Sequence, residues 1–437
     1  MIERKLVFLG LVLAVGLALP ACTHGQQQPT HATRLTRLEA ERIALANNPQ
    51  MAESRLLTLE QAQQVRATRS AEAPQANIAL DAVDAHPGSR ITAGGLNNPT
   101  IYNRASAGIL VTQLITDFGR TRNLIRSAQS GAQATAAQER ATSQEIVLAV
   151  DAAFYQALIS QSVQQVAQQT VNQRQALVDQ ITVLTANKLR SDLDLSLARV
   201  QLAQAQLLLL DVQAQARDDM AGLNTLLGSE QNTTYDLDGS ESDSPEPAPD
   251  DAEPLVSEAF AQRPDLAALN LYHTSAVQFS KAERDLWMPA ISAAGAAGTT
   301  PVRADQITSS WYGTAGAQVD IPIFNGALYS ARIHEAQLKA QISQQQVRDL
   351  RDRIARDVRV SVLNTQTAYQ RISVTEAMLK EANLALDLAN ARYKLGLSGI
   401  VELSDAQLAQ TQAAIASVNA RYGYQTALAG LRFQLGR

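Results

Sequence analysis

Two stretches decide the fold of this sequence: Ala46-Asn47-Asn48-Pro49-Gln50 and, about 215 residues later, Ala261-Gln262-Arg263-Pro264-Asp265. Pro74 and Pro289 are separated by the same interval. Other matches follow in the same order at an interval of about 208: Ile146 and Val150 with Ile354 and Val358, Asp194-Leu195 with Glu402-Leu403, and Leu227-Gly228 with Leu435-Gly436. So many ordered matches indicate an internal duplication.

Each copy begins with the same predicted elements. A helix is expected from about Thr36 to Ala73 and from about Pro254 to Met288, and the proline that follows each one cannot continue a helix. Residues 75–115 and 290–323 then alternate small, polar and apolar residues between turn residues. This pattern predicts two β-strands in each copy.

A very long helix is predicted after each pair of strands. The two helices cover about 68 residues each and end at Ala186 and Lys394, so each is roughly 100 Å long at about 1.5 Å per residue. Apolar residues between Leu379 and Tyr393 recur at alternating spacings of three and four, which is typical of a coiled-coil seam. A shorter helix returns over residues 192–228 and 400–436.

The composition favours long packed helices over a compact enzyme core. Apolar residues make up 46% of the chain but aromatic residues only 4%, and such chains are typical of helical assemblies. The net charge of −5 argues against binding of nucleic acid. The single cysteine and the irregular spacing of the five histidines provide no metal site. We therefore predict no catalytic residues, no cofactor, no metal and no enzymatic activity.

The first 22 residues predict a lipoprotein signal peptide. Residues 6–19 are apolar and too short to span a bilayer, which needs about twenty residues. The sequence Leu19-Pro20-Ala21-Cys22 resembles a bacterial lipobox, in which Cys22 becomes the acylated first residue of the mature chain. The alternative is an ordinary secretory signal that is cut near Ala21 and leaves Cys22 as an incidental thiol.

Four strands cannot close a barrel within one chain. An open sheet edge cannot lie in lipid, and a closed transmembrane barrel needs at least about eight strands. We find no second stretch of eighteen apolar residues, so a membrane crossing requires strands from several chains. Strand number alone does not choose between two, three and four chains. Aromatic residues near the predicted strand ends fit either a girdle at the lipid interface or an ordinary core: Tyr102, Trp287, Trp311 and Tyr312.

Residues 36–437 resemble the TolC-like outer-membrane efflux proteins. The resemblance rests on Thr116-Asp117-Phe118-Gly119-Arg120, Arg263-Pro264-Asp265-Leu266, Ile321-Pro322-Ile323-Phe324-Asn325-Gly326, Ala391-Arg392-Tyr393-Lys394-Leu395-Gly396 and Glu402-Leu403-Ser404-Asp405-Ala406-Gln407. It implies a mainly α fold with a small transmembrane β part. Duplicated long coiled-coil helices and four strands per protomer would close as a homotrimer into a twelve-stranded barrel.

The resemblance also implies a location and partners. The protein is expected in the cell outer membrane, in contact with its lipid, with a long periplasmic extension. Its expected partners are a periplasmic adaptor (membrane fusion) protein and an inner-membrane transporter.

A periplasmic gate is implied at the two helix-to-helix turns, near residues 188–194 and 396–402. Glu402 and Asp405 match acidic residues that line the family's entrance, and side chains three apart share one helix face. Threefold symmetry would make them carboxylate rings, which favour cations. Without the resemblance, both acids fit a solvated helix N-terminus.

The family also links its two helical pairs across the gate. Tyr393 and Asp194 match such a link, and a hydrogen bond from the phenol to the carboxylate is chemically reasonable. The family's arginine in the second turn is absent, because Ser398 stands there.

The predicted organisation has five segments. They are a signal peptide (1–21), an N-terminal tether (22–35), a first efflux repeat (36–228), an acidic linker or peripheral segment (229–253) and a second efflux repeat (254–437). The linker is rich in Asp, Glu, Ser and Pro, as in solvated segments.

The predicted function is the outer-membrane channel of a tripartite export system, a passive duct for small molecules such as drugs or metal ions. One alternative is the outer-membrane component of a type I protein secretion system. Another is a periplasmic coiled-coil adaptor lipoprotein, which the tandem duplication with strands in both copies disfavours. An enzyme on a helical scaffold has no supporting group of residues.

Overall fold

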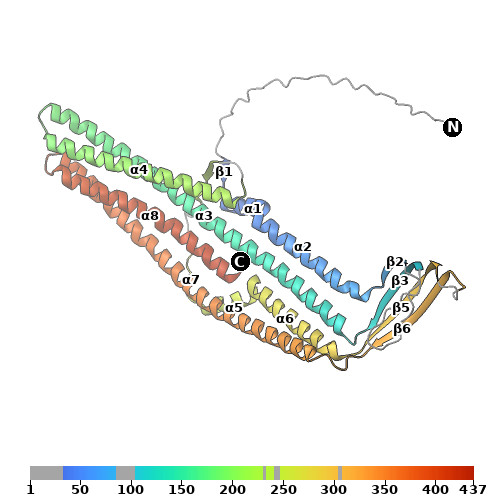
Figure 1. The fold of residues 1–437 in the computed structure, drawn as a ribbon. Coiled ribbons are helices and arrows are strands. Elements are labelled where there is room, and N and C mark those ends of the chain that lie inside the picture. Colours follow the sequence, from blue (N-terminus) through green and yellow to red (C-terminus); the bar gives the residue numbers. More distant parts are fainter. Residues whose placement is uncertain (1–32, 85–103, 230–232, 241–246, 304–307) are drawn as a thin grey trace, which may run out of the picture.

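The molecule is elongated, with a four-stranded sheet at one end and long helices that run away from it (Figure 1). The structure is a computed structural model that describes residues 33–84, 104–229, 233–240, 247–303 and 308–437. In chain order the elements are β1 (Thr33–Leu35), α1 (Arg37–Asn47), α2 (Pro49–Arg69), β2 (Gln75–Val83), β3 (Arg104–Thr116), α3 (Arg120–Ala186), α4 (Asp192–Leu226), β4 (Tyr235–Leu237), α5 (Glu253–Gln262), α6 (Pro264–Arg284), β5 (Ala290–Val302), β6 (Trp311–Asp320), α7 (Leu328–Lys394) and α8 (Ile400–Leu435).

The first helix of each copy is broken, although a single helix was expected over residues 36–73 and 254–288. Asn48 separates α1 from α2, and Arg263 separates α5 from α6. Both residues are extended, with ψ of 127° and 120°, because a following proline disfavours the helical conformation of the residue before it. That proline then occupies the first turn of the next helix, where its missing N–H costs nothing.

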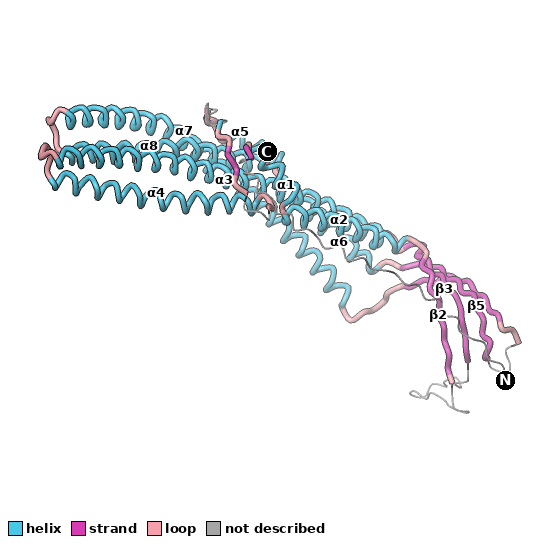
Figure 2. Tube along the Cα trace, turned by 90° about the horizontal axis from the view of Figure 1, so that it is seen from above, coloured by secondary structure: helices cyan, strands magenta, loops and turns pink. Residues whose placement is uncertain are grey.

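The prediction of two very long helices is confirmed, since α3 and α7 each contain 67 residues. In the half of the molecule far from the sheet, the helices lie side by side in the order α4, α3, α8, α7 (Figure 2). In the half near the sheet the order is α2, α3, α6, α7. Helix α3 is therefore central throughout, whereas α7 forms one edge, and α2 and α4 form the other.

The duplication recurs in the core. Ile146 and Val150 of α3 are buried in a cluster with Leu223 of α4. Their equivalents Ile354 and Val358 of α7 are buried with Leu431 of α8 in a second cluster. The sequence matches thus occupy corresponding places in two separate apolar cores.

The two predicted strands per copy form one antiparallel sheet in the order β2-β3-β5-β6. Directly paired residues such as Ile78 and Ile109 share a face, and the register carries this alternation across all four strands. One face is apolar and includes Ile78, Leu80, Ile109, Val111, Ala297, Trp311 and Val319. The opposite face includes Gln75, Asn77, Asp81, Arg104, Thr112, Ser292, Thr314 and Asp320.

The aromatic residues are divided between these surfaces. Trp311 lies on the apolar face and is 74% exposed, as a residue at a lipid interface would be. Tyr312 lies on the polar face, and its hydroxyl leaves no room for a Cβ at Gly108. Trp287 packs edge-on against Tyr329, with ring centroids 5.5 Å apart. Of these residues, Trp311 has the position that suits a girdle.

The tether and the linker contain structure that the sequence did not predict. Strands β1 and β4 pair in parallel, and Arg34 forms an ion pair with Asp238 at 2.9 Å. Leu35 and Leu237 are buried in the core cluster of copy one. The segment 229–253 is therefore not wholly a solvated linker, because β4 holds part of it against the start of repeat one.

Among the helices that the structure describes, one, α3, is long enough and has an 18-residue window apolar enough to cross a membrane by length and composition, although no such segment was expected from the sequence. Half of that window is buried inside the protein, as in the core helix of a soluble assembly. Cys22 and Tyr102 lie outside the described residues.

Candidate functional site

The turns that join α3 to α4 and α7 to α8 lie beside each other at the end farthest from the sheet (Figure 2). Lys188 and Gly396, which are equivalent in the duplication, both adopt left-handed backbone conformations, with φ of 58° and 74°. A residue in this conformation ends a helix and reverses the chain. The two turns therefore have matching geometry, as expected of a duplicated tip.

Tyr393 is the contact point between the two turns. It lies near the end of α7 and is only 2% exposed. The guanidinium carbon of Arg190, in the first turn, lies 4.4 Å from the centroid of its ring. Arg190 Nη2 also donates a hydrogen bond to the Tyr393 carbonyl oxygen at 2.9 Å. One arginine of copy one thus binds both the ring and the backbone of copy two.

The predicted hydrogen bond from Tyr393 to Asp194 is not formed. The Tyr393 hydroxyl is buried and has no hydrogen-bond partner among the described residues. Burial raises the pKa of the Tyr393 phenol above its ordinary value, the charge of Arg190 opposes this, and the charge of Asp194 adds to it. Asp194 is therefore a near neighbour of Tyr393 that acts through its charge.

Arg190 was missed by the sequence reasoning. The sequence gives one indication of its role. Arg190 occupies the first turn at the position that corresponds to Ser398 in the second turn, where the family has an arginine. Ser398 stands at that place, and its hydroxyl is buried without a partner in the described part of the chain.

The two acids predicted to line the entrance lie near the start of α8 and are exposed. Glu402 Oε1 lies 2.9 Å from Arg392 Nε, and both side chains are about half exposed. An exposed pair of this kind contributes at most about 1 kcal/mol. No ion pair of Asp405 is found within the described ranges. The structure thus leaves Asp405 as the more open carboxylate.

The seam between α3 and α8 contains a buried polar layer near the tip. The hydroxyls of Thr170 and Thr411 lie 3.3 Å apart. Arg174, one helical turn farther along α3, is 7% exposed, and its Nη1 has no partner among described residues. Burial lowers the pKa of Arg174. Gln407 Oε1 and Ser404 Oγ are also buried there and have no hydrogen-bond partner in the part of the chain that the structure describes. Since buried polar groups normally find partners, this seam is less well satisfied than the apolar cores.

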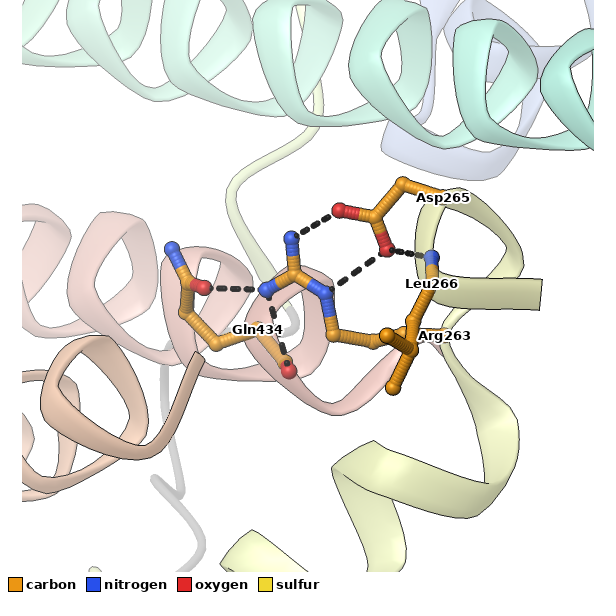
Figure 3. Close-up of polar contacts among 4 residues, drawn as sticks. All are labelled: Arg263, Asp265, Leu266 and Gln434. Carbon is orange, nitrogen blue, oxygen red and sulfur yellow. Dashed lines mark hydrogen bonds and ion pairs between the residues drawn. The ribbon is translucent and has the colours of Figure 1, made fainter. Parts of the chain in front are cut away.

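The motif Arg263-Pro264-Asp265 fastens the helix break of copy two to the end of α8 (Figure 3). Arg263 Nη1 donates to the side-chain oxygen of Gln434 at 2.5 Å, and its Nε and Nη2 donate to the two Asp265 carboxylate oxygens at 3.0 and 2.7 Å. Asp265 Oδ1 also accepts from the backbone N–H of Leu266 at 2.8 Å. Burial raises the pKa of Asp265, but the hydrogen bonds and charge of Arg263 outweigh it and hold that pKa below its usual range.

Copy one makes the same connection with a smaller residue. Asn48 Nδ2 donates to the Leu226 carbonyl at 3.1 Å, and its Oδ1 accepts from the Gln50 backbone N–H at 2.8 Å. The helix ends approach so closely that a Cβ on Gly228 would lie 2.7 Å from the Asn47 carbonyl oxygen, and one on Gly436 would lie 2.9 Å from the Arg263 nitrogen. Both glycines have positive φ. The repeated Leu-Gly pair is therefore part of this joint.

A cavity of about 730 Å³ continues the polar face of the sheet towards the helices. Gln75, Thr112 and Ser292 line it from the strands, and Asp117 and Asp285 line it from the helix ends. Apolar side chains such as Leu114 and Met288 also line the cavity, so its lining is mixed.

Comparisons with known proteins agree with this geometry. The family model described as Outer membrane efflux protein matches residues 42–229 and 255–437. Outer membrane protein TolC of Escherichia coli (strain K12) is 23% identical over 416 residues, which cover 90% of this chain and 80% of TolC.

Solved structures with the same fold include CusC and a membrane protein from Pseudomonas aeruginosa. CusC has a TM-score of 0.79 at 21% identity, and the P. aeruginosa protein has a TM-score of 0.79 at 22% identity. Each similarity covers 92% of both chains. The mainly helical fold with a small β part is thus confirmed.

Proposed function

Because the chain belongs to the outer membrane efflux protein family, we propose that it is the outer-membrane channel of a tripartite export system. It would act as a passive duct for small molecules such as drugs or metal ions, driven by an inner-membrane transporter and joined to it by a periplasmic adaptor. Family membership also confirms that the chain is a channel protein and not an enzyme.

One observation carries the proposal that several chains build the channel. Apolar residues of α7 are exposed: Ile342 by 57%, Leu363 by 61% and Met378 by 44%. Their equivalents in α3, about 208 residues earlier, are Ala134, Tyr155 and Thr170, which are 0%, 3% and 7% exposed. Within one chain, α6 and α8 pack on α3 and cover the side on which these three residues lie. In the duplication, α2 and α4 are the equivalents of α6 and α8. The corresponding side of α7 should therefore be covered by α2 and α4 of another chain.

The other edge of the chain offers that cover. Leu56 and Leu59 of α2 and Val200 and Leu207 of α4 are each more than half exposed. Contacts between α7 of one chain and α2 and α4 of the next are head-to-tail, and such contacts form a ring when the rotation from chain to chain closes. In the sheet, β2 and β6 are the two edges, so β6 of one chain would pair with β2 of the next. The family resemblance supports a ring of three chains.

In this ring the apolar face of the sheet contacts lipid, and the polar face lines the channel. A transmembrane barrel needs this alternation. The lipid anchor proposed at Cys22 would hold the start of the mature chain in the same membrane. The barrel itself is sufficient to keep assembled trimers there, so Cys22→Ala should impair sorting or assembly more than membrane residence. Release of assembled trimers into the soluble fraction would contradict this.

The tip of the helices is proposed as the periplasmic gate. Glu402 and Asp405 of three chains would form carboxylate rings at the entrance, and Tyr393 would link the hairpins through Arg190 in place of a hydrogen bond to Asp194. The contacts of Arg190 with Tyr393 support a link at this place. Opening would then require the two hairpins of each chain to separate at Arg190.

The proposal is tested with the full-length protein, in fractionated cells and after purification. We expect trimers in the outer-membrane fraction of the cells. The purified protein should form cation-selective channels in planar bilayers. Recovery of the protein only from inner membranes would instead favour the adaptor hypothesis. To separate small-molecule efflux from type I protein secretion, drug and metal susceptibility and the secreted proteins of a deletion strain would be compared with those of the complemented strain.

A further inference from the structure

A buried carboxyl group lies where the N-terminal helix α1 packs on α3. Asp151 of α3 is only 4% exposed. Its Oδ2 lies 3.6 Å from Arg37 Nη1 at the start of α1, and its Oδ1 has no hydrogen-bond partner in the described part of the chain. Arg37 also pairs with Glu41, one turn farther along α1. Two carboxyl groups thus meet around one arginine at the contact between the helices.

The surroundings of Asp151 provide little screening of charge. Helix α1 contributes Arg37 and Glu41, and α8 contributes the charge of Arg432. The residues on either side of Asp151 in α3 include Val150 and Phe154, which belong to an apolar cluster with Leu223 of α4, Leu227 at the end of α4 and Leu237 of β4. In such a setting, interactions between charges are stronger than in water, and an unpaired charge is costly.

The Asp151 carboxyl group loses its proton at a higher pH than an ordinary aspartate does. Burial, a hydrogen bond with Glu41 and the negative charge of Glu41 raise the pKa of Asp151 to about 7, against the opposing charges of Arg37 and Arg432. Burial and a neighbouring negative charge both disfavour the ionised form of a carboxyl group. Above neutral pH Asp151 is ionised and carries a buried charge, and its Oδ1 has no hydrogen-bond partner among the described residues.

The equivalent place in copy two has the opposite charges and a different setting. Arg359 of α7 corresponds to Asp151, and Glu253 begins α5 as Arg37 begins α1. Arg359 Nε donates to Glu253 Oε1 at 2.7 Å, and both side chains are about half exposed or more. The hydrogen bond with Arg359 lowers the pKa of Glu253 and raises that of Arg359. This pair therefore stays charged throughout the neutral range.

We propose that Asp151, Glu41 and Arg37 form a proton-dependent clamp, which holds α1 against α3 while Asp151 keeps its proton and loosens when Asp151 is ionised. The clamp acts in copy one alone. The helix α1 follows directly on β1, so its loosening would also free the β1–β4 contact that holds part of the 229–253 segment.

The pH range follows from linkage. The pKa of Asp151 in the docked state, about 7, exceeds the ordinary value of 3.8 that a released side chain would have. The docked state therefore binds more protons between these values. Docking of α1 is strongest in acid, weakens as the pH rises from about 4 to about 7, and changes little above that range.

Hydrogen exchange of the full-length protein, corrected for the intrinsic effect of pH, measures this docking. Between about pH 5 and about pH 8, amides of α1 should lose at least about tenfold in protection, whereas amides of α5 should not change. Asp151→Asn keeps the shape without the charge, so α1 should remain protected at both pH values. Glu253→Gln is the matched control in copy two and should leave the pH dependence of α1 unchanged.

Two further measurements keep the test decisive if Asp151→Asn fails to fold. In the wild type, the infrared band of a protonated carboxyl group should disappear with a midpoint near pH 7. Glu41→Gln removes the neighbouring negative charge, so the loosening of α1 and this midpoint should both move to lower pH. Equal protection of α1 at both pH values in the wild type, or an unmoved midpoint in Glu41→Gln, would overturn the clamp.

Discussion

The two long helices α3 and α7 have the same length and corresponding sequences, yet their surroundings differ. Twenty residues of α3 are buried, but only nine residues of α7 are. Helix α3 packs between helices of its own chain on both sides, whereas α7 has neighbours on one side. The difference teaches that corresponding residues of the two copies are buried on α3 and exposed on α7, and this exposed side of α7 is the surface that we propose another chain completes.

The largest expected effect comes from charging the uncovered side of α7. Leu363→Asp combined with Met378→Asp would bury two unpaired carboxylates at each contact between chains, which costs at least several kcal/mol. Trimers should be lost while the monomer remains folded, as measured by native mass spectrometry and circular dichroism.

Glu376→Lys is the matched control on α7. Its equivalent in α3, Gln168, is exposed although α3 is central, so position 376 should face water in the assembled ring. Trimers should persist in this variant. If the double aspartate variant forms trimers as readily as Glu376→Lys, α7 is not the completing surface.

The next effect distinguishes the helix breaks of the two copies. Arg263→Ala removes the partner of the half-buried Asp265 carboxylate and should destabilise the protein by about 2–3 kcal/mol. Asn48→Ala removes a neutral cap and should cost about 1 kcal/mol. Thermal unfolding of both variants measures the difference.

The cost of Arg263→Ala should also depend on pH. The folded-state pKa of Asp265 lies below its usual value because of Arg263, so this stabilisation is present above the ordinary pKa and is lost as the pH falls. The effect of Asn48→Ala should be constant over the same range. Equal costs for the two variants at all pH values would show that the joints are energetically equivalent.

A smaller effect is expected where copy one contacts copy two at the tip. Arg190→Ala removes a cation–π contact worth about 0.5–1 kcal/mol and a hydrogen bond, so channels in planar bilayers should open more often. Tyr393→Phe should have little effect, because the Tyr393 hydroxyl has no partner within the described residues. A larger effect of Tyr393→Phe than of Arg190→Ala would instead support the hydrogen bond to Asp194.

The smallest energetic effect is expected at the entrance. Glu402→Ala with Asp405→Ala removes exposed carboxylates, which contribute little to stability but attract cations. The ratio of anion to cation conductance should rise. Unchanged selectivity would mean that these acids are only a solvated helix start.

Local features of the sequence determined much of this architecture. The duplication, the ends of the long helices and the two strands per copy follow from hydrophobic periodicity and from proline and glycine, which act over a few residues. The break at Asn48 and at Arg263 was equally local, because the residue before proline resists the helical conformation, but the helical pattern on both sides obscured it. The proposed gate region follows from family resemblance, which predicted Tyr393 near Asp194 without revealing Arg190.

Only the tertiary structure decided which distant side chains meet. Arg190 contacts Tyr393 across 203 residues, and Asp151 meets Arg37 because α1 folds back on α3. The pairing of β1 with β4 likewise joins residues about 200 positions apart. No periodicity encodes such contacts, since they depend on the register in which helices and strands pack. Periodicity determined the elements of this protein, and packing decided where its charges are buried, exposed or shared.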